Sequence, residues 1–214
     1  MGEVRYAPPA VQQAEQQRAM YRPVERKVLR EAARWEKKNR PALVEQARRL
    51  AMGLYHGRAI EARPYRLGLA LSQGEVPWAE TWARCSLDAY PWARPNPSRL
   101  PLSCWVATSQ RLVGRLRSGA WAGWAWDGVD TYRADLSRGK EWVEVVGEGR
   151  QLTLFGPGVA PLAVALTWKI YGAMALLEHP GLGPLRVEMT PQKAPEAMLA
   201  LPERDPLEDL LRGM

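Results

Sequence analysis

The spacing of apolar residues changes along this chain, and that change limits the folds open to it. From Pro23 to His56 apolar side chains recur with helical spacing, whereas from Trp121 to about residue 155 they alternate with a period close to two. A period near 3.6 indicates an amphipathic helix, and a period of two indicates a half-buried strand. Helices that precede a block of strands favour an α+β fold over an alternating βαβ fold.

The N-terminal region is predicted to hold two helices that meet at Pro41. Proline lacks an N–H donor and clashes with the preceding turn, so Pro41 is expected to break or restart the helix. The second helix should end near Gly57, because glycine is favoured just past a helix end. The apolar side of the first helix carries Val24, Val28, Ala32 and Trp35.

A four-strand antiparallel meander is predicted over residues 120–155, with turns at 127–128, 137–140 and 147–149. Asp127-Gly128 is the strongest of these turn signals. The almost entirely apolar segment 159–177 should form one long helix across the sheet, with Lys169 reaching outwards. The expected fold is therefore α+β: an N-terminal helical region followed by an antiparallel four-strand β-meander covered by a long apolar helix.

Composition divides the chain into five segments. These are a flexible arm (1–20), a basic helical region (21–72), a Trp/Pro-rich connection (73–104), the α+β core (105–190), and a linker with an acidic amphipathic tail helix (191–214). Within the connection, Pro77 is predicted to open a short helix with Trp78, Trp82 and Cys85 on one face. Residues 103–118 fit either a helix or two short strands.

Basic side chains on the first helix form the main candidate binding site. They fall on one arc opposite the apolar side at about 100° per residue. Its members are Arg22, Arg26, Lys27, Arg30, Arg34, Lys37 and Lys38. Such a row can lie along a phosphate backbone and displace its counterions, which gives affinity without sequence readout. The alternative is a solvated face whose basic groups pair with neighbouring glutamates.

The tryptophans near residue 124 are the second candidate site. On a strand Trp124 and Trp126 share one face, and Trp121 takes the other. Trp124 and Trp126, with Arg133 nearby, would be suited to stacking unpaired bases. The alternative is that these rings fill the core between sheet and helix.

No motif in the sequence is typical of a particular enzymatic reaction. The chain has two cysteines and two histidines, too few for a disulfide framework or a four-ligand zinc site of cysteines. Acids of the predicted meander suggest a divalent metal only weakly, because no carboxylate there is followed two residues later by Lys. They are Asp127, Asp130, Asp135, Glu141, Glu144 and Glu148. We expect no cofactor and no metal, and a protein that is not an enzyme; a metal-dependent nuclease is the least favoured alternative.

Charge and the C-terminal segment indicate the partners. The net charge is +7, with the basic excess in the first 72 residues and an acidic excess from residue 141. The tail presents Leu207, Leu210 and Leu211 on one face, which suits docking in a groove of a protein partner. These features favour a nucleic-acid-binding accessory protein, for DNA or RNA, of a phage, plasmid or defence-type complex. The alternative is a structural or assembly subunit of a virion or large complex.

The expected location is the cytoplasm, without membrane association. The first residues have no apolar core of the kind found in signal peptides. Lys169 lies in the middle of the apolar segment 159–177, where a charge would be costly inside a bilayer. The low cysteine content agrees with a reducing compartment.

Overall fold

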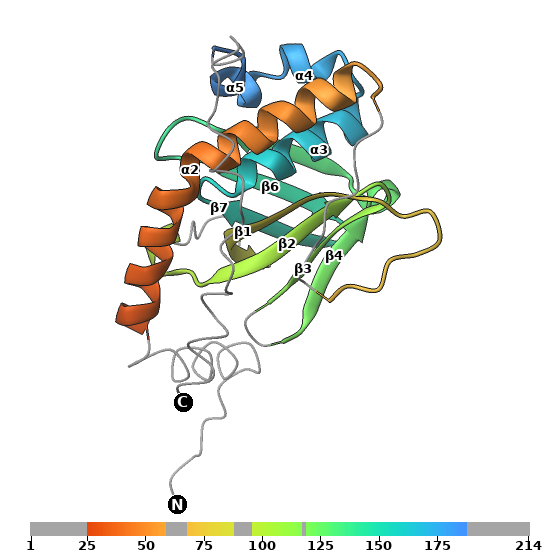
Figure 1. Cartoon of the computed structure of the whole chain (residues 1–214). Helices are drawn as coiled ribbons and strands as arrows, with labels where there is room; N and C mark the ends of the chain where they lie inside the picture. Colours follow the sequence, from red (N-terminus) through yellow and green to blue (C-terminus); the bar gives the residue numbers. More distant parts are fainter. Residues whose placement is uncertain (1–24, 59–67, 88–95, 117–118, 188–214) are drawn as a thin grey trace, which may run out of the picture.

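Seven antiparallel strands form a single curved sheet in the computed structural model, which describes residues 25–58, 68–87, 96–116 and 119–187 (Figure 1). The strands are β1 Pro77–Leu87, β2 Leu102–Thr108, β3 Arg111–Arg115, β4 Trp121–Ala125, β5 Thr131–Asp135, β6 Trp142–Gly147 and β7 Arg150–Phe155. The α-helices are α2 Glu25–Tyr55, α3 Val159–Tyr171, α4 Ala175–Glu178 and α5 Gly183–Val187. The short 3₁₀ turns in these described ranges are η1 Pro97–Arg99, η2 Trp126–Gly128 and η3 Pro180–Leu182.

The strand order corrects the predicted four-strand meander. The order is β4-β3-β2-β1-β7-β6-β5, so two meanders are joined by the pairing of β1 with β7. β4 pairs with β3 and not with β5, and Asp127-Gly128 lies in η2 between the two edge strands rather than in a hairpin. The turns predicted at 137–140 and 147–149 are confirmed, since they join β5 to β6 and β6 to β7.

The sheet curls until its two edges approach one another. Six spacings of about 4.8 Å would separate the edges of a flat sheet by about 29 Å. The connection from Ala125 to Thr131 is too short for that, since six residues reach at most about 21 Å. Contacts show the approach directly: the indole N–H of Trp124 in β4 donates to the carbonyl of Gly147 in β6 at 2.9 Å.

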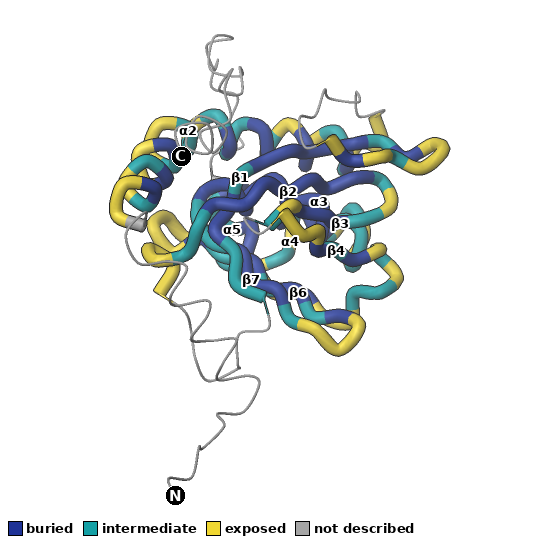
Figure 2. Tube along the Cα trace, turned by 90° about the horizontal axis from the view of Figure 1, so that it is seen from below, coloured by how far each residue is buried: buried dark blue, intermediate teal, exposed yellow. Residues whose placement is uncertain are grey.

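The concave face of this sheet encloses the core. All residues of α3 from Val159 to Thr167 are buried, and the helix packs against β1, β5 and β6 (Figure 2). Trp105 of β2 lies flat over Gly114 of β3, its register partner; a Cβ on Gly114 would lie 2.4 Å from the ring. Glycine therefore makes room for this fully buried indole.

The apolar segment 159–177 does not form the predicted long helix over the sheet. α3 has 13 residues and ends at Tyr171, followed by Gly172 with a φ of 83°. This left-handed conformation favours glycine and stops the helix, and the short α4 starts at Ala175. Lys169 is half-buried beneath two indoles, with its ammonium 5.2 Å from the Trp78 ring and 5.1 Å from the Trp168 ring.

α2 is one helix of 31 residues that continues through Pro41, so the predicted break there is wrong. The helix bends instead (Figure 1), as a proline inside a helix commonly causes. The bend lets the two halves cover different surfaces. The N-terminal half packs Ala32 and Trp35 on Trp82 and Leu102, whereas the C-terminal half joins the core beside α3 through Ala47, Leu50, Ala51 and Leu54.

The predicted helix from Pro77 is also wrong, because this segment is the central strand β1. β1 pairs on both sides and is buried on both faces over most of its length, so its apolar residues show no period of two. Residues 103–118 supply β2 and β3, the second of the two alternatives. Among the described residues, no helix combines the length and apolar content needed to cross a bilayer.

Candidate nucleic-acid interface

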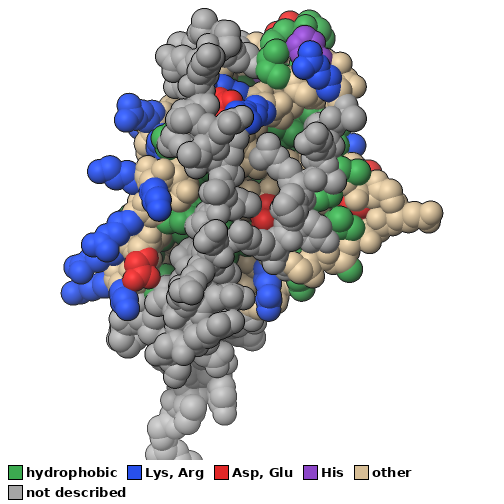
Figure 3. Space-filling model, in the orientation of Figure 1, with side chains coloured by type: hydrophobic (Ala, Val, Ile, Leu, Met, Phe, Trp, Pro, Cys, Tyr) green, Lys and Arg blue, Asp and Glu red, His purple; other side chains and the backbone are tan. Residues whose placement is uncertain are grey.

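The N-terminal half of α2 carries a row of exposed basic side chains, which we call the basic ridge. Its members are Arg26, Lys27, Arg30, Arg34, Lys37 and Lys38, all exposed. Figure 3 shows basic side chains projecting together from the side of the molecule formed by this half of the helix. Arg22, the remaining predicted member, lies outside the described residues.

Packing on the opposite side of the helix fixes the direction of the ridge. Val28, Ala32 and Trp35 are buried and fall at helical spacing. The basic residues of the ridge lie on the opposite side of the helix and are therefore turned to solvent. From Arg26 to Lys38 the ridge runs about 18 Å along the helix axis, at about 1.5 Å per residue.

Glu36, which lies between ridge residues in the sequence, is turned towards the sheet and not towards the ridge. Glu36 accepts two hydrogen bonds from Arg84 of β1, at 2.7 Å to Nε and 3.0 Å to Nη2. Arg84 is only 5% exposed, and it also donates to the carbonyls of Pro97, Ser98 and Leu100. Glu36 thus compensates a buried cation and is not available to the ridge.

Arg40 is likewise removed from the exposed face, because it pairs with the buried Glu141 just before β6. Within the described part of the chain, no ion pair joins a ridge residue to a carboxylate. The ridge therefore places like charges four residues apart, as in Arg26–Arg30 and Arg30–Arg34. Such pairs destabilise a helix by about 0.2–0.5 kcal/mol each. An anionic partner would relieve this repulsion.

The predicted stacking tryptophans are not available at the surface. Trp124 is 2% exposed, and the guanidinium of Arg150 lies 4.9 Å from the centroid of its ring. Trp126 belongs to η2 and not to the strand; it is half-buried and donates its indole N–H to the carbonyl of Thr108 at 3.1 Å. The burial of Trp124 corrects its assignment as a base-stacking residue, since a base would find no free ring face.

Arg133 is exposed on the edge strand β5, directly opposite Glu144 of β6. The strand order separates β5 from β1, the strand that contacts α2, by two other strands. The structure therefore does not bring Arg133 together with the ridge.

Trp121 is the aromatic residue that the sequence argument assigned to the other face. It is 47% exposed at the start of β4, and its register partner is the exposed Arg115 of β3. The signal was present in the alternation, because Trp121 and Trp124 point to opposite sides of the strand. The alternation alone does not show which side of β4 faces the core.

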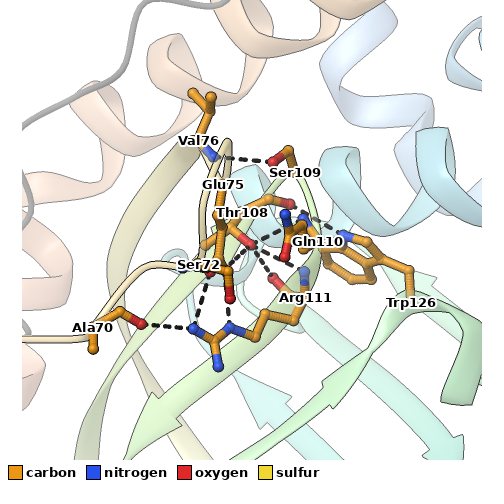
Figure 4. A network of polar contacts seen from close by, with 9 residues as sticks. All are labelled: Ala70, Ser72, Glu75, Val76, Thr108, Ser109, Gln110, Arg111 and Trp126. Carbon is orange, nitrogen blue, oxygen red and sulfur yellow. Dashed lines mark hydrogen bonds and ion pairs between the residues drawn. The ribbon is translucent and has the colours of Figure 1, made fainter.

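A second charged cluster lies at the turn between β2 and β3 (Figure 4). The buried carboxylate of Glu75 accepts hydrogen bonds from Arg111 Nε at 2.9 Å, Thr108 Oγ1 at 2.7 Å and the Ser72 N–H at 2.8 Å. Burial raises the pKa of Glu75, but these hydrogen bonds outweigh it, and the pKa lies below the ordinary value. Both carboxylate oxygens of Glu75 accept hydrogen bonds, so this cluster is a structural clamp that holds the segment before β1 against β3.

Other predicted features give no chemical site. In the described ranges no three His, Cys, Asp or Glu side chains gather to hold a metal ion. Of the predicted meander acids, Asp127 lies in η2, Glu148 lies in the β6–β7 turn, and Glu141 pairs with Arg40. Leu207, Leu210 and Leu211 of the predicted docking tail lie outside the described residues.

Comparison with known protein families and with curated proteins finds no match to this chain. The case for a function therefore depends on the geometry of the ridge and of its surroundings.

Proposed function

We propose that this protein binds the sugar–phosphate backbone of a nucleic acid through the basic ridge, as a non-enzymatic accessory protein. One observation carries the proposal: six exposed cations share one helix face, and the intervening Glu36 is committed to Arg84. Phosphate groups are the anions that a regular row of cations suits best, because they recur along a strand.

Binding of this kind gains free energy from the release of condensed counterions, so it weakens steeply as salt rises. Contacts to phosphate fix position but read no sequence. The ridge is therefore expected to bind DNA or RNA without marked sequence preference. The Glu36–Arg84 pair would hold the helix, and with it the ridge, in a fixed place on the sheet.

Fluorescence anisotropy of labelled oligonucleotides, titrated over a series of salt concentrations, tests the proposal. Replacing Arg26, Arg30 and Arg34 by alanine should weaken binding strongly and reduce the slope of log K against log salt by about 2–3. The matched control replaces three exposed cations elsewhere, Arg58, Arg138 and Lys140, and should keep the wild-type slope.

Three results would contradict the proposal. Equal loss of affinity in the two triple variants would show that binding depends on the net charge of the protein and not on the ridge. Binding to anionic lipid vesicles, with no binding to any nucleic acid at low salt, would assign the ridge to a different anion. A large salt-stable oligomer that carries no nucleic acid would favour the assembly-subunit alternative.

A further inference from the structure

Trp121 and Arg115 are exposed neighbours on the convex face of the sheet. The two residues are direct register partners on β4 and β3, so their side chains leave the sheet on the same side. Both are exposed. A single exposed apolar residue is ordinary on a protein surface, but a tryptophan beside an arginine offers two planar groups on which a base can stack.

The local sequence keeps Trp121 out of the core. Ala122 and Trp124 take the concave side of β4, where both are buried. The next residue on the convex side is Gly123, which has no side chain to lie over the indole. A Cβ there would meet the Leu112 carbonyl at 2.4 Å, so the close approach of β3 requires glycine.

The register places this pair on the same face of the sheet as the N-terminal half of α2, the helix that carries the basic ridge. Trp121 opposes Arg115, Arg115 opposes Cys104 of β2, and Cys104 opposes Trp82 of β1, so the four side chains form one row across the convex face. Trp82 packs against Ala32 and Trp35, the apolar side of the helix that carries the ridge.

The distance between the two features suits a short strand of nucleic acid. Three strand spacings separate Trp82 from Trp121, about 14 Å. The ridge lies across α2 from Trp82, which adds about one helix diameter of 10–12 Å. At about 3.4 Å per nucleotide along a strand, about seven to eight nucleotides cover the total of about 25 Å. A strand whose phosphates lie on the ridge can therefore place a base at Trp121 without leaving this side of the molecule.

We propose that Trp121 and Arg115 are a stacking platform for an unpaired base, and that the nucleic acid bound by this protein is single-stranded. The inference rests on the proposed function, because the ridge supplies the backbone contacts. Bases in a duplex are stacked within it and do not reach an aromatic side chain on a protein surface, whereas unpaired bases do.

The test compares a short oligothymidine with an abasic oligonucleotide of the same length, by anisotropy at constant salt. The wild-type protein should bind the base-containing strand more tightly. Trp121→Ala should lower that affinity by about tenfold, to the level of the abasic strand, and should leave binding of the abasic strand unchanged. Trp121→Phe should keep most of the preference, because an aromatic ring remains.

Tyr171→Ala is the matched control, since Tyr171 is 50% exposed but lies at the end of α3. It should behave as wild type with both strands. Suppose that Trp121→Ala keeps the preference for bases while the ridge triple variant loses binding to both strands. The stacking proposal is then contradicted and the ridge proposal is supported. If the abasic strand does not bind at all at low salt, the ridge proposal itself fails. Equal binding of the two strands by the wild-type protein would overturn the platform alone.

Discussion

At the scale of single residues, buried charges tie distant parts of the chain together. Arg84 joins β1 to α2 through Glu36, Glu141 joins the start of β6 to α2 through Arg40, and Glu75 joins the segment before β1 to β3 through Arg111. A buried charge without a partner is costly, so each pair specifies one arrangement of its elements more than it adds net stability. Two of these three pairs hold α2, the helix of the ridge.

Replacement of Glu36 by alanine should lower the free energy of unfolding by about 3–5 kcal/mol, because it leaves the buried Arg84 uncompensated. Urea denaturation measures this change. The double variant Glu36→Leu with Arg84→Met should be much less destabilised, since apolar groups of similar volume then replace both charges. A loss below about 1 kcal/mol in the single variant would be inconsistent with a buried pair.

The clamp at Glu75 predicts a stability that depends on pH. Its pKa is lowered from 4.5, so the folded protein holds the carboxylate more strongly than the unfolded chain does. This contribution is present above pH 4.5 and is lost as the pH falls towards the lower folded-state pKa. Glu75→Gln should therefore lose less stability than wild type between neutral and acid pH, as measured by urea unfolding at each pH. A parallel pH profile in the two proteins would argue against the clamp.

At the scale of elements, the sequence predicted those features that depend on near neighbours. The helical spacing from Val28 to Trp35 fixes which side of α2 faces solvent, and this is why the exposed face of the ridge was predictable. β1 was misassigned because a central strand buried on both faces has no alternation to detect. Pro41 was read as a break because the packing that sustains α2 beyond it comes from α3 and the sheet.

The turn between β6 and β7 offers a prediction at this scale. Glu148 has a φ of 51° and Gly149 a φ of 69°, so both central residues of this two-residue hairpin loop are left-handed. Asparagine tolerates this conformation better than glutamate. Glu148→Asn should therefore raise the free energy of unfolding by about 0.5–1 kcal/mol in thermal or urea unfolding, while Glu148→Ala should bring no gain. Similar stabilities for the two variants would show that the turn is not strained.

At the scale of the whole molecule, closure of the sheet decides which surfaces exist. The pairing of β1 with β7 joins segments that are far apart in the sequence. The short link from β4 to β5 joins the two strands at opposite ends of the strand order. No local pattern contains that information. The sequence therefore identified tryptophans 121, 124 and 126 as the relevant segment but could not tell that the curled sheet buries Trp124 and leaves Trp121 outside.

The same substitution at these two tryptophans should separate stability from binding. Trp124→Leu removes a buried indole and its hydrogen bond to Gly147, so it should cost about 3 kcal/mol or more in unfolding free energy. At temperatures where the variant stays folded, its affinity for single-stranded oligonucleotides should match wild type. Trp121→Leu should change stability by less than about 0.5 kcal/mol, while its affinity for the base-containing strand falls. Urea unfolding and anisotropy on both variants measure the two effects. If Trp124→Leu weakens binding and Trp121→Leu does not, the assignment of the two faces of β4 is reversed.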